Sequence, residues 1–354
     1  GMPGVVRVMD PKPYDFSFGT TEEEIVRNNL TYLEEVIQYE GPKNIAAMFI
    51  ETVTGTNGIL PPPKGYLKGL KALLEKHGIL LVTDEVMCGW GRTGKLFAFQ
   101  HGDIVPDICT MAKGLTSSYL PLGVMAVSDR IANHFRENVF WGGLTYNAHP
   151  LCLASALAAV NVLVEEGMVQ NAARMGEVMR GHMERLARKH RCVKEHRNIG
   201  LFGTIELRKN SAGERIVPYA GSHPAMAKLG KFLKDNGLFT VLQWSTLMCN
   251  PPLCINEAQM AEGFGIIDRA LDLPDLQAKI AAMASRDGVA VADWKRNWAE
   301  LQEADILLES GGKWEARSPS EAIGVAQWLE GTARAHGLRV GSLWRNLAYE
   351  ERQL

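Results

Sequence analysis

The sequence predicts an α/β protein built on a mostly parallel, doubly wound sheet. Two short apolar runs, Ile79–Thr83 and Ile108–Ala112, are bounded by turn residues, which is typical of strands buried on both faces of such a sheet. Helix-forming and strand-forming segments alternate along the first part of the chain, as in strand–helix–strand units. With 354 residues and 46% hydrophobic content, the chain is long enough for a large core and more than one domain.

The first part of the chain carries clear signals for where helices begin and end. Thr21 and Glu24 have the spacing of a capping box, so we expect a helix from there to about Gln38. Gly41 and Pro42 follow and end that helix. The other elements expected in this part are a helix at 64–77 and strands at 45–50, 79–83, 108–112 and 123–128.

The second part of the chain reads as a smaller mixed domain. We expect one strand at 199–207 that passes through two glycines, and further strand-like residues at 238–249. The helices expected here are at about 151–166, 168–190 and 257–271. The expected organisation is a partial large domain with an interdomain helix at 1–164, a smaller C-terminal α+β domain at 165–275, and a helical appendage at 276–354.

Composition argues against several classes of function. A formal net charge of −2 and a pI of about 6.6 give no electrostatic reason to expect nucleic-acid or membrane binding. No apolar run approaches the roughly 18 residues that a membrane span needs. The six cysteines form neither a CxxC pair nor a zinc-ligand spacing, so we expect no metal, reduced thiols and a cytoplasmic location.

Two charged side chains fall at the ends of neighbouring apolar runs. Asp84 follows the first run and Lys113 follows the second. Ligands of parallel sheets bind beyond the carboxyl ends of the strands, so the two groups are expected at one site. A lysine there can form a Schiff base with pyridoxal phosphate while a carboxylate keeps the pyridine nitrogen protonated. Taken singly, an aspartate after a strand is more often a cap and a lysine is more often solvated.

The combination of motifs resembles the class III pyridoxal-phosphate aminotransferases. The motifs are Thr-Asp-Glu-Val at 83–86, Gly-Trp-Gly-Arg-Thr-Gly at 89–94, Pro-Asp-Ile at 106–108, Ala-Lys-Gly-Leu at 112–115 and Leu-Thr-Tyr-Asn-Ala-His-Pro at 144–150. The resemblance extends over roughly residues 40 to 272 and is strongest to the amino acid:pyruvate group, which includes taurine- and β-alanine-type transaminases. It implies fold type I, the aspartate-aminotransferase-like fold, with transfer of an amino group from an amine or amino acid donor to a keto acid such as pyruvate.

The resemblance also implies roles for individual residues. Lys113 holds the cofactor as a Schiff base and then moves the substrate α-proton as a general acid and base. Asp84 pairs with the pyridine nitrogen, and Val86 packs on the face of the ring. Thr145 matches a threonine that reaches the cofactor phosphate of the other subunit, which implies a homodimer.

The sequence departs from the family pattern at the substrate and phosphate sites. Glu51 matches a glutamate near the substrate pocket, but Gln243 stands where many members have an arginine that clamps the substrate carboxylate. Met87 replaces a glutamine that hydrogen-bonds the cofactor ring hydroxyl. The glycine- and serine-rich turn that holds the phosphate is not found, so we expect the usual N-terminal segment of the family to be lacking.

Two alternatives remain open at this stage. An aminomutase or racemase uses the same lysine and aspartate on the same cofactor. A truncated, non-catalytic relative would keep the fold as a scaffold or binding module, with the Trp-rich tail at 276–354 as its contact surface.

Overall fold

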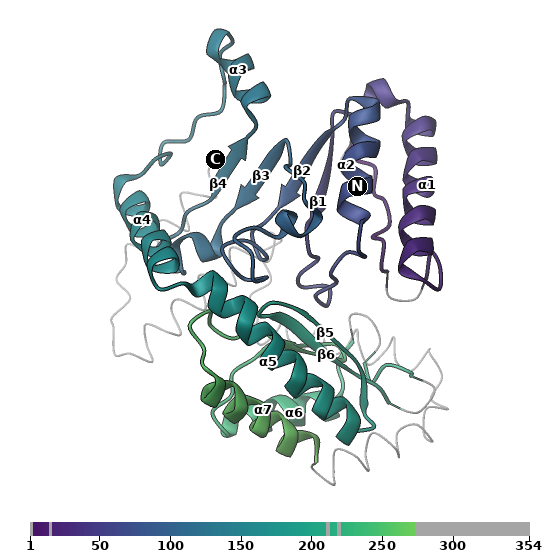
Figure 1. Cartoon of the computed structure of the whole chain (residues 1–354), viewed down its shortest axis with the longest axis vertical. Helices are drawn as coiled ribbons and strands as arrows, with labels where there is room; N and C mark the ends of the chain where they lie inside the picture. Colours follow the sequence, from purple (N-terminus) through teal and green to yellow (C-terminus); the bar gives the residue numbers. More distant parts are fainter. Residues whose placement is uncertain (1–2, 14–15, 210–212, 218–220, 273–354) are drawn as a thin grey trace, which may run out of the picture. The chain divides into compact units, whose positions relative to one another are not determined.

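The computed structural model describes residues 3–13, 16–209, 213–217 and 221–272 (Figure 1). The helical appendage expected at 276–354 lies outside the described residues.

A four-stranded sheet forms the first part of the structure. Its strands lie in the order β1 (Ala47–Glu51), β2 (Leu80–Asp84), β3 (Ile108–Met111) and β4 (Val124–Val127). The β1–β2 and β2–β3 pairs are parallel, whereas β4 runs antiparallel to β3. The expectation of an α/β fold with a mostly parallel sheet is therefore confirmed.

Two helices pack on this sheet beyond β1 (Figure 1). They are α1 (Glu22–Glu40) and α2 (Tyr66–His77). The expected capping box is present, because Thr21 Oγ1 accepts from Glu24 N and the Glu24 carboxylate accepts from Thr21 N. Their buried stripes form one core with the underlying strands; its members include Leu33, Ile37, Tyr66, Leu70, Leu74 and Leu81.

The second part is an antiparallel sheet covered by helices, as expected for a smaller α+β unit. Its strand order is β5 (Val193–Ile199), β6 (Phe202–Leu207), β8 (Thr246–Cys249) and β7 (Leu242–Gln243). The helices that pack with it are α5 (Met168–Lys189), α6 (Pro224–Asp235) and α7 (Glu257–Leu271), whereas α4 (Pro150–Glu165) packs against the segment at 113–116 and against α5. One face of α5 supplies Met175, Met179, Met183 and Leu186 to the core beneath them.

The expectation of a single strand at 199–207 is wrong. The chain turns at Gly200, which has φ +55°, and β5 and β6 form an antiparallel hairpin around it. A Cβ on Gly200 would lie 2.3 Å from the backbone carbon of Thr93, so the turn is fixed by close packing against a loop distant in sequence. The local sequence around Gly200 carries no signal of this contact with Thr93.

Five further elements were not expected from the sequence. They are helix α3 (Asp129–Glu137), helix α6, and the short 3₁₀ helices η1 (Pro42–Asn44), η2 (Ala98–Gly102) and η3 (Lys113–Thr116). Of these, η3 matters most for function, because it begins at Lys113.

Two arginines join the loops of the first sheet to the second sheet through backbone carbonyls. Arg92 Nη1 donates to Leu201 O at 3.1 Å and to Pro251 O at 2.6 Å. Arg197 donates to Gly58 O and Ile59 O. The domain boundaries at 164 and 275 stay a prediction.

Among the described residues, no single helix is long and apolar enough to cross a membrane. Helices α4 and α5 reach the length and apolar content of a membrane span only when they are counted together, and the chain bends by 59° between them.

Candidate active site

The ends of three neighbouring strands bring the expected site residues to one edge of the first sheet. Glu51 of β1 is in register with Asp84 of β2, and Asp84 is in register with Thr110 of β3. Lys113 follows Thr110 by three residues, beyond the end of β3. Asp84 and Lys113 thus leave the carboxyl ends of adjacent parallel strands, as the sequence predicts, where ligands of such sheets bind.

Lys113 is held in an unusual backbone conformation. Its φ of +43° lies in the left-handed region, where a residue with a Cβ is strained by about 1–2 kcal/mol. Ser117 and Ser118, at the other end of the same turn, also have positive φ. The Lys113 side chain is exposed, and its amine has no hydrogen bond or ion pair among the described residues. Such strain at an unpaired lysine is typical of functional positions.

Asp84 is half-buried and keeps one oxygen available. Its Oδ1 accepts a hydrogen bond from Val86 N at 2.8 Å, and no donor among the described residues reaches Oδ2. The bond to Val86 orients the carboxylate at the strand end. Val86 itself is half-buried.

Glu51 contacts a loop that also touches Met87. Glu51 Oε2 accepts from Gly55 N at 2.8 Å, and a Cβ on Gly55 would lie 2.5 Å from Met87 Sδ. A Cβ at this position would require the flexible Met87 side chain to move. The hydrogen bond from Gly55 N orients the exposed Glu51 carboxylate.

Thr145 and Gln243 are not joined to this group by any hydrogen bond among the described residues. Thr145 is exposed in the turn between α3 and α4. Gln243 lies in β7 of the second sheet, where its backbone oxygen accepts from Thr246 Oγ1. α4 does pack against η3, so the segment that follows Thr145 lies beside the lysine turn.

The sequence reading gave no role to Glu85 or Arg92, although both are central to these loops. Glu85 is fully buried and accepts hydrogen bonds from several segments. Burial lowers the pKa of Arg92 to about 10, and its guanidinium bonds to two carbonyls of the second sheet region. Glu85 could have been found from the sequence, because a second acid directly after a strand-end aspartate points away from it.

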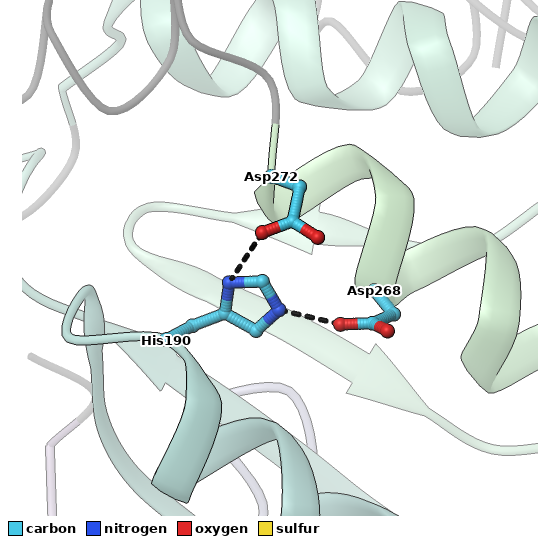
Figure 2. A group of neighbouring side chains, drawn as sticks. All are labelled: His190, Asp268 and Asp272. Atoms are coloured by element: carbon cyan, nitrogen blue, oxygen red, sulfur yellow. Dashed lines mark hydrogen bonds and ion pairs between the residues drawn. The ribbon is translucent and has the colours of Figure 1, made fainter.

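A histidine and two aspartates form a cluster far from the strand ends in sequence (Figure 2). His190 Nε2 lies 2.6 Å from Asp268 Oδ1, and His190 Nδ1 lies 3.6 Å from Asp272 Oδ1. The ammonium group of Lys189 contacts both carboxylates, at 2.9 Å from Asp268 Oδ1. Because Lys189 already supplies the positive charge, we interpret the cluster as an ion network joining the ends of α5 and α7 and assign it no metal.

Comparison with known proteins identifies the family. The sequence profile of the family described as aminotransferase class-III matches residues 2–271. The chain belongs to the class-III aminotransferases. The strand-end lysine and aspartate described above lie inside the matched region of this family.

Its relatives include transaminases that are named for different substrates. A diaminobutyrate–2-oxoglutarate transaminase from Halomonas elongata is 39% identical over 77% of this chain and 58% of its own. A taurine–pyruvate aminotransferase from Bilophila wadsworthia is 32% identical over 76% of this chain and 60% of its own.

A similar solved structure is taurine:2-oxoglutarate aminotransferase from Bifidobacterium kashiwanohense, described in complex with PLP and glutamate. It has a TM-score of 0.73 and 39% identity over 76% of this chain and 61% of its own. The fold is therefore that of the PLP-dependent transaminases, and the chain spans about three-fifths of the length of these relatives.

The residues at the strand ends fit pyridoxal phosphate. The cofactor needs an unprotonated or exchangeable amine for its aldehyde and an anionic acceptor for its pyridine N–H. Among the described residues, Lys113 supplies an amine without a partner and Asp84 supplies a carboxylate oxygen without a donor, on adjacent strand ends. The amine and the carboxylate thus match the aldehyde and the pyridine nitrogen of this cofactor.

Proposed function

We propose that the protein is a pyridoxal-phosphate-dependent aminotransferase that moves an amino group from an amine or amino acid to a keto acid such as pyruvate. The observation that carries the proposal is that adjacent parallel strand ends carry a backbone-strained Lys113 and an Asp84 oxygen that have no partner in the part of the chain that the structure describes. The relatives named above are transaminases, which favours this reaction over an aminomutase or racemase.

Lys113 is proposed as the catalytic residue. Its Nζ would hold the cofactor and, once displaced by the incoming amino donor, would accept the proton of the substrate α-carbon and donate it to the cofactor carbon that had carried the aldehyde. Its exposure leaves the amine accessible to both tasks. The bound cofactor supplies an electron sink for the bond that loses its proton.

Asp84, Val86 and Thr145 are proposed to bind the cofactor. The Asp84 carboxylate pairs with the pyridine nitrogen, an ion pair that is strengthened when water is excluded. Val86 packs on the ring, and its N–H keeps Asp84 Oδ1 in place. Thr145 is exposed on a single chain, which agrees with a role toward the phosphate bound by a partner subunit.

Glu51 and Gln243 are proposed to contact the substrate. Glu51 is in register with Asp84 and is anionic, whereas Gln243 is uncharged and cannot clamp a carboxylate bidentately. This pair favours amino donors that are neutral or cationic at their far end over donors with a second carboxylate.

A homodimer is proposed because a single chain leaves a large apolar surface in water. The loop between α3 and α4 exposes Trp141 at 91%, Tyr146 at 79% and Leu144 at 76%. Helix α4, which follows this loop, adds Leu151, Leu153 and Leu157, all exposed. Contiguous apolar surfaces of this kind mark protein interfaces, and this one includes the Thr145 turn.

The domain boundaries at 164 and 275 and a cytoplasmic location are kept as proposals. All six cysteines lie in the described residues and none forms a disulfide, which supports a reducing compartment.

The test is the visible absorption spectrum of the purified protein before and after pyridoxal phosphate is added. We expect a yellow band from lysine-bound cofactor that bleaches when taurine, β-alanine, alanine or a diamine is added and returns with pyruvate. Absence of any band at saturating cofactor would contradict the proposal and favour a scaffold role. A band that no amino donor bleaches would contradict transamination alone.

A further inference from the structure

Glu85 is a fully buried carboxylate that the proposed mechanism does not use. Its exposed fraction is 0%, and it follows Asp84 directly in the chain. Its backbone N–H bonds to Thr110 O at 2.9 Å, so it continues the pairing of β2 with β3 by one residue. Successive side chains of an extended segment point to opposite sides, and Asp84 and Glu85 accordingly have different partners.

Both carboxylate oxygens of Glu85 accept hydrogen bonds, and the donors come from separate segments of the chain. Oε1 accepts from Thr52 Oγ1 at 2.8 Å and from Phe99 N at 2.9 Å. Oε2 accepts from Ala98 N at 2.8 Å and lies 3.4 Å from Cys88 Sγ. A side chain surrounded only by donors is matched to the ionised, acceptor-only carboxylate.

These bonds tie together the segments that border the strand-end site. Thr52 directly follows Glu51, whereas Ala98 and Phe99 begin η2. The Glu85 carbonyl also accepts from Gly89 N, which closes the turn after Val86. Loss of this carboxylate would release the end of β1 and the start of η2 together, and would remove the contact with Cys88 in the turn beside Asp84.

The negative charges of Glu85 and Asp84 both raise the pKa of the two cysteines near the strand ends. Burial, together with the charges of Glu85 and Asp84, raises the pKa of Cys109 on β3 to about 11. The pKa of Cys88 is raised by burial and by the same two charges. Burial also raises the pKa of Glu85 itself, while the donors from Ala98, Thr52 and Phe99 act in the opposite direction.

We propose that Glu85 is a positioning residue that fixes the Asp84 turn and places a second buried negative charge behind the Asp84 carboxylate, so that the nitrogen paired with Asp84 stays protonated. The inference rests on the proposed function, since that nitrogen belongs to the cofactor. Glu85 has no contact with the reacting atoms and acts through Asp84.

The first test uses the cofactor-free full chain and needs no activity. Glu85→Gln keeps the shape of the side chain but removes its charge. It also places an NH₂ group, which cannot accept, against the donors that bind the Glu85 carboxylate. Hydrogen exchange of the peptide containing Ala98 and Phe99 is expected to become about tenfold faster, because each amide loses or weakens its acceptor. Unchanged exchange in this peptide would overturn the positioning role.

The second test measures the pH at which the pyridine nitrogen of the bound cofactor loses its proton, followed by nitrogen NMR of cofactor labelled at that atom. Removal of a nearby negative charge makes a cationic nitrogen easier to deprotonate, so the midpoint for Glu85→Gln should fall by about half to one pH unit. The matched control is Thr52→Val, which removes one hydrogen bond to Glu85 but keeps the charge. Its midpoint should stay at the wild-type value while cofactor affinity falls several-fold.

The outcomes separate this inference from the proposed function. If the wild-type protein binds no cofactor, the proposed function and this inference both fail. If the wild type binds cofactor and Glu85→Gln titrates at the wild-type midpoint, only this inference fails. If Glu85→Gln does not fold, Thr52→Val decides: unchanged cofactor affinity and unchanged exchange at Ala98 and Phe99 would overturn the role.

Discussion

Glu51 and Asp84 are the last residues of two hydrogen-bonded parallel strands and lie opposite each other in register. Because registered neighbours in a sheet project to the same face, the two carboxylates border one site. Their hydrogen bonds differ: Gly55 N binds Glu51 Oε2, and Val86 N binds Asp84 Oδ1. The two acids are therefore expected to respond differently to neutralisation.

Replacement of Asp84 by Asn should weaken cofactor binding and turnover together. The lost charge-assisted contact should lower kcat/KM by about ten- to a hundredfold. Glu51→Gln is the matched comparison and should alter KM for the amino donor while leaving cofactor affinity near wild type. Titration of the visible band gives the affinity of each variant, and equal losses of cofactor affinity in both would contradict the assignment.

Replacement of Lys113 by Ala should abolish the visible band and any borohydride-reducible adduct. The fold should survive, because the side chain is exposed and has no partner among the described residues. Lys68→Ala, at an exposed position on α2, serves as the control and should keep the band. A reducible adduct in Lys113→Ala would show that another lysine holds the cofactor.

Charge on the exposed loop should break the proposed dimer. Trp141→Glu places a carboxylate on the exposed apolar surface and should shift the sedimentation coefficient to that of a monomer, with loss of the visible band if Thr145 serves the partner site. Tyr39→Glu, at an equally exposed position on α1, should leave the assembly unchanged. A monomeric wild-type protein that still binds cofactor would contradict the dimer proposal.

Asp107 should make stability depend on pH in the acid range. Burial alone would raise its pKa, but Lys71 Nζ at 2.7 Å, Leu81 N at 2.9 Å and Arg130 lower it below the ordinary value of 3.8. A depressed carboxyl pKa contributes stability above the unfolded value, and this contribution is lost as pH falls through the folded pKa.

We therefore expect Asp107→Asn to lower the free energy of unfolding by about 2 kcal/mol at pH 7, with a smaller difference from wild type at pH 3. Urea unfolding at the two pH values measures this, with exposed Asp103→Asn as the control. A difference that does not change with pH would count against the ion pairs.

Arg92→Met should destabilise the contact between the first-sheet loops and the second sheet. The substitution leaves Leu201 O and Pro251 O without the donors that bind them and should reduce the free energy of unfolding by about 2–3 kcal/mol. Arg185→Met, on an exposed face of α5, is the control, and the two are compared by thermal unfolding. Equal losses in both variants would contradict a special role for Arg92.

The elements that sequence reasoning found are those whose signals are local. The capping box at Thr21 sets the start of α1, and the apolar run before Asp84 sets β2. The strand-end site followed, because parallel strands bring their carboxyl ends together. Helix α6 also carried a usable signal that was overlooked: Pro224 at its start, with Ala225, Leu229 and Leu233 buried at helical spacing.

The elements that the sequence did not predict depend on contacts between segments that are distant in the chain. The turn at Gly200 is set by Thr93 and Gly94, more than a hundred positions earlier in the chain. β5 contains charged residues at Lys194, Glu195 and Arg197, so its strand character comes from pairing with β6 and not from an apolar run. Helix α3 is short and buries no residue, and its apolar side chains at helical spacing are only Ile131 and Phe135.

The glycine contact at the β5–β6 turn limits how the two sheets can move. A Cβ on Gly176 would lie 2.6 Å from the Cα of Gly200, and one on Gly200 would lie 2.5 Å from the nitrogen of Gly94. Three main chains therefore meet with no side chain between them, and even a small rotation there would make them collide. Any hinge movement between the two sheets would have to pivot at another point, and substitutions meant to preserve the fold should avoid this junction.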